Sequence, residues 1–389
     1  MKKNKYNPIT IICFLCVFVC YPPVGINYIY PKLMYYFRIG EVMFFIASFA
    51  LLIRNRFRCN CITKYIILYY LYIYIVGMIQ GNNLPWNSPF SIISMSIILP
   101  FFYNKDNKGA TKGIIAYFEY LCVIQILSQI IYPNGMAYTH GRYFQNWIIG
   151  FKNYPIRYLI PGAIFEVLNA YENEDTFFSK RSILYLVVMI YIIYMSKCAT
   201  AFVGLSIFLI MIIAYSKFQL PKWASIKVII FVTISAFCLI YFIGFQKYFR
   251  YVIENILEKD LEFTGRYVIW DASFMWVKEH FLFGSGIMED YFSVLGCASH
   301  AHQYWLQIFV CGGMLGFFLH IIIFIKCDEL LLQSKSNKVV IAYFAGIFAY
   351  LVMGIDEALA HSEMFLPLLA IAVENVRTNK STINMYSHS

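Results

Sequence analysis

Apolar stretches of about 17–23 residues recur along the whole chain, and they limit the folds that it can adopt. Roughly 20 helical residues span the hydrocarbon core of a bilayer. We therefore predict an all-α polytopic integral membrane protein, with about 12 transmembrane helices in a single transmembrane domain over residues 1–389. The predicted spans are 9–26, 35–53, 64–80, 88–103, 113–132, 156–171, 181–196, 198–215, 226–245, 303–325, 339–355 and 362–376. Pro22 and Pro23 lie at the end of the first apolar stretch, and no small-residue cleavage site is evident, so no cleaved signal peptide is expected.

The composition excludes a chain built of ordinary soluble domains. It is 60% hydrophobic and 13% charged, with a mean hydropathy of +0.63, and a soluble domain needs many more charges to cover its surface. The 11 cysteines lie mostly in apolar stretches, where a cysteine behaves as a small hydrophobe. Cys59 and Cys61 form a C-x-C that no second pair completes. We expect no metal site and no cofactor.

The basic residues predict how the chain lies in the membrane. With a cytoplasmic N-terminus, 20 of the 31 lysines and arginines fall in the inner segments, as the positive-inside rule requires. Both termini are then expected in the cytoplasm. The net charge of +10 follows from this distribution, and the dispersed cations give no support to nucleic-acid binding.

Two predicted outer segments are longer than ordinary connections, 133–156 and 246–302. In the second, Tyr267, Trp270, Phe274, Val277 and Phe281 recur at a spacing of three to four, which predicts an amphipathic helix at the membrane surface. Residues 248–263 suit another such helix, and "GSG" at 284–286 ends the helical pattern. The outer face also receives Trp86, Trp147, Trp270, Trp276 and Trp305, as an interfacial belt or as platforms for sugar rings.

Charged and imidazole side chains gather on the same predicted outer face. A cationic outer cavity suits an anionic ligand, because the planar arginine fork matches phosphate with two parallel hydrogen bonds. A lipid phosphate or pyrophosphate is the ligand that this placement favours, and a simple headgroup contact is the alternative for any one arginine. The candidate residues for binding pyrophosphate or glycan are Arg142, Lys152, Arg157, Arg250, Glu289, Asp290, His300, Asp356 and Glu357.

Short motifs in these segments resemble the O-antigen ligase and polymerase superfamily. The matching residues are Gly265, Arg266 and Trp270 in a "GR…W" segment, Gly284 and Gly286 in a "G-x-G", and His302, Leu306, Gln307, Gly313 and Gly316 in an "H-N-x-x-L-Q…G-x-x-G" segment. Gln303 replaces the usual asparagine but keeps an amide. "GFKNYPIRY" and "SKCATAFVGL" are weaker matches upstream. The resemblance covers roughly residues 140–325.

The resemblance implies a metal-independent transferase of the glycosyltransferase C type in the bacterial inner membrane. It implies an active site facing the periplasm and undecaprenyl-pyrophosphate-linked glycans as donor and acceptor. A polymerase moves the growing chain onto a new carrier-linked repeat unit, whereas a ligase joins finished glycan to the lipid A core. A lipid-linked glycan flippase is disfavoured, because it predicts charges at mid-membrane depth. A chain-length regulator is the protein partner that the family suggests.

Two residues are the expected catalytic groups. Arg266, with Arg142 or Arg157, is predicted to stabilise the departing phosphate, and Lys152 is a further candidate. His302 is predicted to orient or deprotonate the attacking hydroxyl, because imidazole titrates near neutral pH. The carboxylates Glu289, Asp290, Asp356 and Glu357 are expected to assist or to hold sugar hydroxyls. The sugars, the linkage and the stereochemical outcome stay open.

Overall fold

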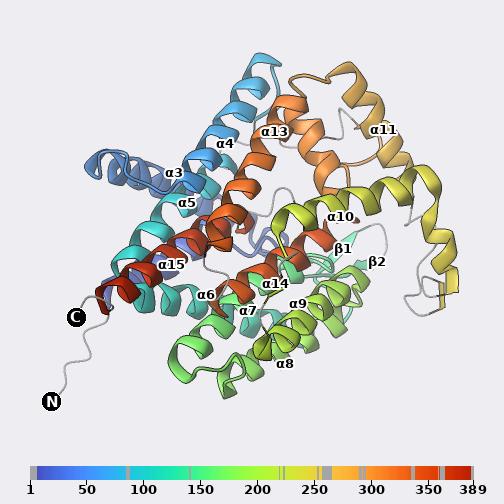
Figure 1. Cartoon of the computed structure of the whole chain (residues 1–389). Helices are drawn as coiled ribbons and strands as arrows, with labels where there is room; N and C mark the ends of the chain where they lie inside the picture. Colours follow the sequence, from blue (N-terminus) through green and yellow to red (C-terminus); the bar gives the residue numbers. More distant parts are fainter. Residues whose placement is uncertain are drawn as a thin grey trace.

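A computed structural model describes residues 7–84, 88–139, 142–218, 220–221, 224–251, 254–255, 265–288, 291, 295–333, 338–357, 359 and 364–386. Helices follow one another along almost all of this length (Figure 1). Their bounds are α1 Pro8–Cys20, α2 Ile26–Ile29, α3 Pro31–Arg54, α4 Cys61–Ile79, α5 Ser88–Lys105, α6 Asn107–Ile131, α7 Pro155–Glu174, α8 Lys180–Ser196, α9 Ala199–Lys217, α10 Ile226–Cys238, the π-helix η1 Leu239–Ile243, the 3₁₀-helix η2 Phe245–Phe249, α11 Arg266–Glu279, α13 Tyr304–Leu332, α14 Lys338–Met353 and α15 Phe365–Tyr386.

Each of the predicted apolar stretches coincides with one of the longer helices, which confirms the all-α class. Six helical segments in the described part of the chain are long and apolar enough to cross a membrane. They are Pro31–Arg54, Cys61–Ile79, Asn107–Ile131, Ala199–Ser216, Ile226–Ile243 and Tyr304–Leu332. The predicted count of about 12 spans is therefore not confirmed.

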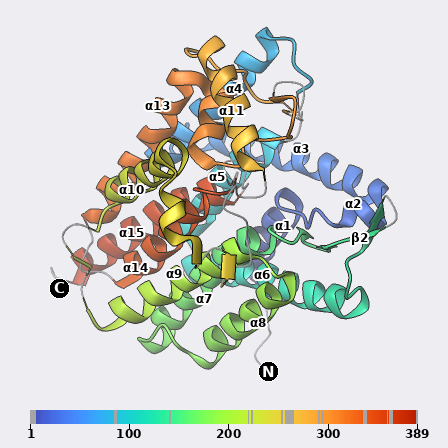
Figure 2. The ribbon, with the colours of Figure 1, turned by 90° about the vertical axis from the view of Figure 1, so that its right-hand side faces the viewer.

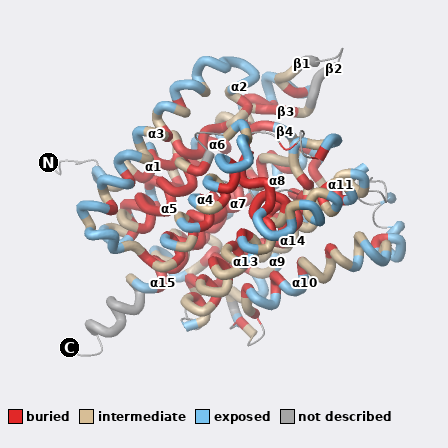
Figure 3. The backbone as a smooth tube through the Cα atoms, turned by 90° about the horizontal axis from the view of Figure 1, so that it is seen from above, coloured by how far each residue is buried: buried red, intermediate tan, exposed pale blue. Residues whose placement is uncertain are grey.

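The outer surface of the helix bundle is apolar, as lipid contact requires. Ile79 on α4 is 80% exposed, Tyr194 on α8 is 76% exposed and Phe231 on α10 is 71% exposed. Exposed residues surround a buried interior when the chain is viewed from above (Figure 3). Apolar area on this scale is unfavourable in water, so the surface supports a membrane protein.

The first long segment, 133–156, folds into two short antiparallel hairpins. β1 (Ala137–Thr139) pairs with β2 (Arg142–Phe144), and β3 (Asn146–Trp147) pairs with β4 (Gly150–Phe151). The second hairpin is fixed to α6, because the amide of Ile149 donates to Gln125 Oε1 at 3.1 Å. This attachment determines where the residues that follow β4 lie.

The amphipathic helix predicted in the second long segment is α11, and this prediction is confirmed. α11 lies beside α13 (Figures 1 and 2). Its Trp270 is buried with its ring edge against Phe237 at 5.1 Å, while Val268 and Met275 on another face are exposed. The second predicted helix, 248–263, lies largely outside the described residues, and only its start overlaps η2.

The interfacial role predicted for the tryptophans is wrong for three of them. Trp147, Trp270 and Trp305 are buried inside the protein. Trp147 donates to the carbonyl of Tyr132, and Trp305 donates to Thr233 Oγ1. A buried indole finds an internal partner for its N–H, so these rings hold elements together and are not available to lipid or sugar.

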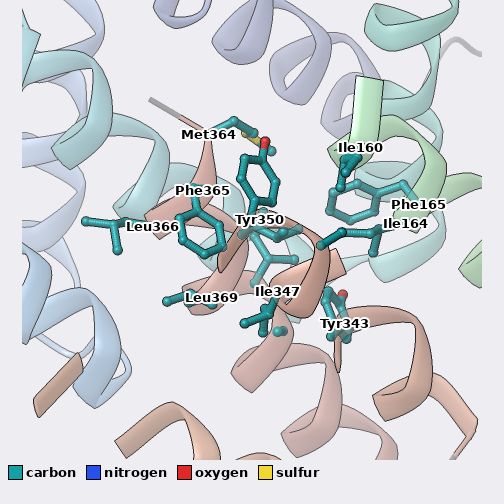
Figure 4. Close-up of a cluster of buried hydrophobic side chains, with 14 of the residues drawn as sticks. Ile160, Ile164, Phe165, Tyr343, Ile347, Tyr350, Met364, Phe365, Leu366 and Leu369 are labelled. Atoms are coloured by element: carbon teal, nitrogen blue, oxygen red, sulfur yellow. The ribbon is translucent and has the colours of Figure 1, made fainter. Parts of the chain in front are cut away.

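One cluster of buried hydrophobic side chains in the core comes from α7, α14 and the start of α15 (Figure 4). Gly346 lets α14 approach α7 closely, since a Cβ there would lie 2.1 Å from Ile164 Cδ1. Tyr350 stacks on Phe365 with ring centroids 4.4 Å apart, and its hydroxyl donates to the backbone carbonyl of Arg157. The core is thereby tied to the first turn of α7.

α13 reverses direction inside what the sequence predicts as one span, 303–325. Gly313 interrupts the helix with φ 56° and ψ −159°. In a continuous helix, Trp305 and Phe324 would be about 28 Å apart, yet their rings lie 5.8 Å apart, and the hydroxyl of Tyr304 is 2.7 Å from His320 Nε2. The predicted span 303–325 is therefore helical, but it is divided at Gly313. The segment before Gly313 folds back on the segment after it.

The "GSG" segment fits into this reversal. The amide of Ser285 donates to the carbonyl of Val310 at 2.9 Å, and that of Gly286 donates to Cys311 at 2.7 Å. A Cβ on Gly284 would lie 2.4 Å from the nitrogen of Gly313. The glycines that carried the family resemblance thus allow two backbones to touch, and they set the position of the segment that begins α13.

Candidate functional site

Charged side chains and an imidazole from four separate parts of the chain meet at one place. Arg157 lies in the first turn of α7, and Arg266 is the first residue of α11. His302 lies in the turn that precedes α13, while Asp356 and Glu357 follow α14. All five are among the predicted site residues, and the fold brings them together.

An ion-pair network joins the two arginines to the two carboxylates. Arg266 donates through Nη1 to Asp356 Oδ1, and through Nη2 to Glu357 Oε1 at 3.0 Å. Arg157 Nη2 lies 3.6 Å from Glu357 Oε2. The four side chains are at most 24% exposed. Removing one partner of an ion pair this buried destabilises the fold, because it leaves an uncompensated charge away from water.

Three polar residues support the carboxylates, and the sequence motifs only hinted at them. Asn153, next to β4, donates to Glu357 Oε1 at 2.5 Å, and Thr200 on α9 donates to Asp356 Oδ2 at 3.2 Å. Cys198 Sγ lies 3.2 Å from Asn153 Oδ1. These residues belong to the weakly matching segments "GFKNYP" and "SKCATAF", which was the signal that could have identified them.

His302 adopts a left-handed backbone, with φ 48°, which few residues other than glycine accept. Two glutamines hold this turn. Gln303 caps α13 by accepting from the amide of Leu306 at 2.5 Å, and Gln307 Oε1 accepts from the amide of Ala301 at 2.6 Å. The imidazole of His300 lies tilted against that of His302, with ring centroids 4.0 Å apart. The backbone therefore directs His302 toward the ion-pair network.

The electrostatics of the site keep His302 neutral. Burial lowers its pKa to about 4. Glu357 opposes this shift, whereas the nearby Arg266 and Arg157 reinforce it. Nδ1 of His302 is buried and has no hydrogen-bond partner among the described residues. At neutral pH the ring can accordingly accept a proton or a hydrogen bond from a bound molecule.

Asp356 shifts in the opposite direction. Burial raises its pKa to about 6, although Arg266 opposes the shift. Folded Asp356 therefore keeps its proton to a higher pH than the unfolded chain does. Its contribution to the stability of the fold falls as the pH rises from 3.8 through 6. The lowered pKa of His302 instead removes stability as the pH falls from 6.5 toward 4. Between about 4 and 6 the two contributions have opposite signs and partly cancel.

The resting protonation of His302 can be measured directly. We expect one imidazole resonance of the isotope-labelled protein, identified by its loss in His302→Gln, to titrate near pH 4. The physical reason is the cost of charging a buried ring beside two arginines. A midpoint near the ordinary histidine value of about 6.5 would contradict the neutral resting state.

Of the other predicted residues, His300 touches the site through its ring contact with His302. Lys152 Nζ lies 5.9 Å from the ring centroid of Phe151, and His300 Nδ1 is 3.0 Å from Ser299 Oγ. Arg250 is exposed and pairs with Glu254 at 3.6 Å. Arg142 begins β2, and Glu289 and Asp290 lie outside the described residues. Their binding roles remain predictions.

Within the residues that the structure describes, no three His, Cys, Asp or Glu side chains group as metal ligands. The metal independence of the reaction stays a prediction. What the arrangement offers is two guanidinium groups, whose five donors each suit phosphate oxygens, beside a neutral imidazole. The two carboxylates hold the arginines in place until an anion competes for them.

In a comparison with known protein families, residues 184–321 match a family model described as O-Antigen ligase. The matched region contains Arg266, His302 and Thr200. Arg157 and Asn153 lie before it, and the two carboxylates lie after it, so their place in the site rests on geometry. No curated protein matches the chain significantly. The match confirms the resemblance to the O-antigen ligase and polymerase superfamily, whose members are glycosyltransferase-like enzymes.

Proposed function

From the O-antigen ligase domain over residues 184–321, we propose that this chain is an O-antigen polymerase. It transfers a growing glycan from undecaprenyl pyrophosphate onto a new lipid-linked repeat unit at the periplasmic face of the inner membrane. The observation that carries this proposal is the meeting of Arg157 and Arg266 with the neutral His302 at the start of α13. Such a site suits a reaction that releases a pyrophosphate.

The proposed step forms one bond and breaks one. An oxygen of the acceptor sugar attacks the anomeric carbon of the donor, and the bond from that carbon to the pyrophosphate oxygen breaks. The electron pair leaves with undecaprenyl pyrophosphate, and the proton of the attacking hydroxyl passes to a base. Negative charge grows on the departing phosphate, so fixed cations at that position lower the barrier. Arg266 and Arg157 are the cations assigned to it.

His302 is the base in this mechanism. With a pKa near 4 it is neutral but weakly basic in the resting site. A bound pyrophosphate adds negative charge nearby, which raises the pKa of the imidazole and strengthens it as a proton acceptor. Substrate binding thereby activates the base. Asp356, with its pKa of about 6, is close enough to neutrality to share the proton.

The guanidinium geometry of Arg266 gives a first test. Arg266→Lys keeps the charge but loses the fork that spans Asp356 and Glu357. We expect glycan transfer by the purified protein to fall by about 100-fold, the usual cost of losing one donor to a developing anion. The matched control is Arg54→Lys, at the end of α3 and outside the site. Activity within twofold of the wild type in Arg266→Lys would argue against the assigned role.

The second candidate function is that of the ligase, because the matching family model carries that description. The same chemistry applies, but the acceptor is the lipid A core instead of a carrier-linked repeat unit. The site contacts do not select between these acceptors. The two functions differ in the products that accumulate when the protein is absent.

Deleting the gene and profiling surface lipopolysaccharide by electrophoresis tests the proposal. A polymerase predicts that the ladder collapses to core plus a single repeat unit. Loss of all attached glycan, with carrier-linked polymer still made, would establish the ligase. Carrier-linked repeats trapped on the cytoplasmic side would overturn both and establish a flippase.

A further inference from the structure

A charged cavity lies away from the site, beside the turn that follows α3. It has a volume of about 640 Å³ and is lined by the turn after α3 and by parts of α4, α5 and α15. α15 begins where Phe365 stacks on Tyr350 beside the site. It reaches the cavity at Arg377, 12 residues further, which is about 18 Å along a helix. α4 begins at the cavity, and its far end contacts the "GSG" segment through Gln80.

Cations dominate the lining of this cavity. They are Arg56, Arg58, Lys64, Lys105 and Arg377, and all five are exposed. Glu374 is the one acidic residue among the lining residues, and it accepts from Asn60 Nδ2 at 3.2 Å. In the described part of the chain none of the five cations is in an ion pair. Five positive charges against one negative leave the cavity strongly cationic.

The backbone that supplies two of these arginines is unusual. α3 ends in a turn where Arg56 and Phe57 have φ values of 52° and 56°. Glycine normally occupies such positions, and non-glycine residues there are commonest at functional sites. The turn is well bonded, since the amide of Phe57 donates to Leu52 at 2.8 Å and that of Arg56 to Ile53 at 2.9 Å. It places Arg56 and Arg58 at the rim of the cavity.

Part of the remaining wall is apolar. Leu51, Leu52, Ile97, Pro100 and Phe101 line the cavity beside the cations, and Lys105 Nζ lies 4.3 Å above the ring of Phe101. A ligand complementary to this surface carries both negative charge and hydrocarbon. Phe57 and Ile53 at the same helix end are each 58% exposed, so the apolar wall continues onto the outer surface of the bundle.

We propose that this cavity binds the phosphate-bearing headgroup of an anionic phospholipid, with the acyl chains along the outer face of α3. Basic pockets between membrane helices recognise such headgroups. A general excess of lysine and arginine in inner loops explains the presence of cations here. It does not explain why four elements direct them into one cavity with an apolar wall. This inference goes beyond the proposed glycan transfer and does not depend on it.

Lipid retention by the purified full-length protein tests the proposal. The delipidated protein is incubated with phosphatidylglycerol or with phosphatidylethanolamine of the same acyl chains, and bound lipid is counted by native mass spectrometry. We expect the wild type to retain phosphatidylglycerol preferentially. The triple variant Arg56→Gln/Arg58→Gln/Arg377→Gln should bind it about tenfold more weakly. Arg54→Gln, a neighbouring arginine outside the cavity lining, should bind it as the wild type does.

Two further measurements decide between the proposed lipid site and its alternatives. If the triple variant is not recovered as a monodisperse protein, the matching Arg→Lys triple, which keeps every charge, should show intermediate retention. Equal retention of phosphatidylglycerol by the wild type and by either triple variant would overturn the site. A third outcome is that inorganic pyrophosphate displaces all of the bound lipid and that, without pyrophosphate, the protein prefers neither phospholipid. That outcome would assign the cavity to a free phosphate compound instead.

Discussion

The variant His302→Ala is expected to be expressed normally and to build no full-length glycan. The imidazole of His302 is a neutral proton acceptor beside Arg266, Arg157 and Glu357, and general base catalysis contributes about 10²–10⁴-fold. The loss should appear as a lower kcat with a purified lipid-linked repeat unit, with little change in KM. In the cell the ladder of surface glycan should shorten to a single repeat unit.

The control for this variant is His280→Ala. His280 stacks on Trp276 at 3.8 Å at the end of α11, and its Nδ1 lies 3.3 Å from the carbonyl oxygen of the same residue, so within the described residues these contacts are separate from the ion-pair network. Its loss should leave transfer within about twofold of the wild type, since a surface substitution changes little. A His302→Ala protein that still builds full-length polymer would mean that the base is another group, with Asp356 the next candidate.

The second large effect is expected from a single methyl group at Gly313. Its backbone conformation, φ 56° and ψ −159°, is one that only glycine adopts readily. A Cβ there would also lie 2.5 Å from the nitrogen of Gly284. Gly313→Ala must therefore open the reversal of α13 or break its contact with the "GSG" segment. We expect a loss of about 3 kcal/mol or more in stability, measured as thermal unfolding of the purified protein.

The neighbouring glycine is a matched control. A Cβ on Gly312 would meet its nearest neighbour, Ile73 Cγ2, at 3.7 Å, an ordinary contact, and Gly312 has no positive φ. Gly312→Ala should therefore be tolerated with near-normal stability and activity. If the two variants melt alike, the left-handed turn at Gly313 is not what holds the start of α13.

The helices themselves were predictable because their signal is local. Each apolar stretch became a helix, and the spacing of Tyr267, Trp270 and Phe274 correctly predicted α11. Hydropathy depends only on neighbouring residues, so it is readable before any packing is known. It could not show that 303–325 folds back at Gly313, because a helix that doubles on itself has the same hydropathy as a straight one.

The site was only partly predictable for a related reason. The family motifs pointed to Arg266 and His302, and the matching domain over residues 184–321 contains both. Asn153 and Thr200 were not selected, because their segments match the motifs weakly and a lone amide or hydroxyl carries no chemical signal. Their role emerged from contacts with Glu357 and Asp356.

The sequence by itself determined that this chain is helical and apolar, where along the chain its longer helices lie, and which motif residues are candidates for chemistry. These properties follow from composition and from spacing over one or two helical turns. Only the tertiary structure decided that Arg266 pairs with Asp356 and Glu357, about 90 positions away in the sequence. The same holds for the hydrogen bond from Asn153 to Glu357, which are 204 positions apart. Contacts between distant residues depend on how helices pack, and no local pattern encodes them.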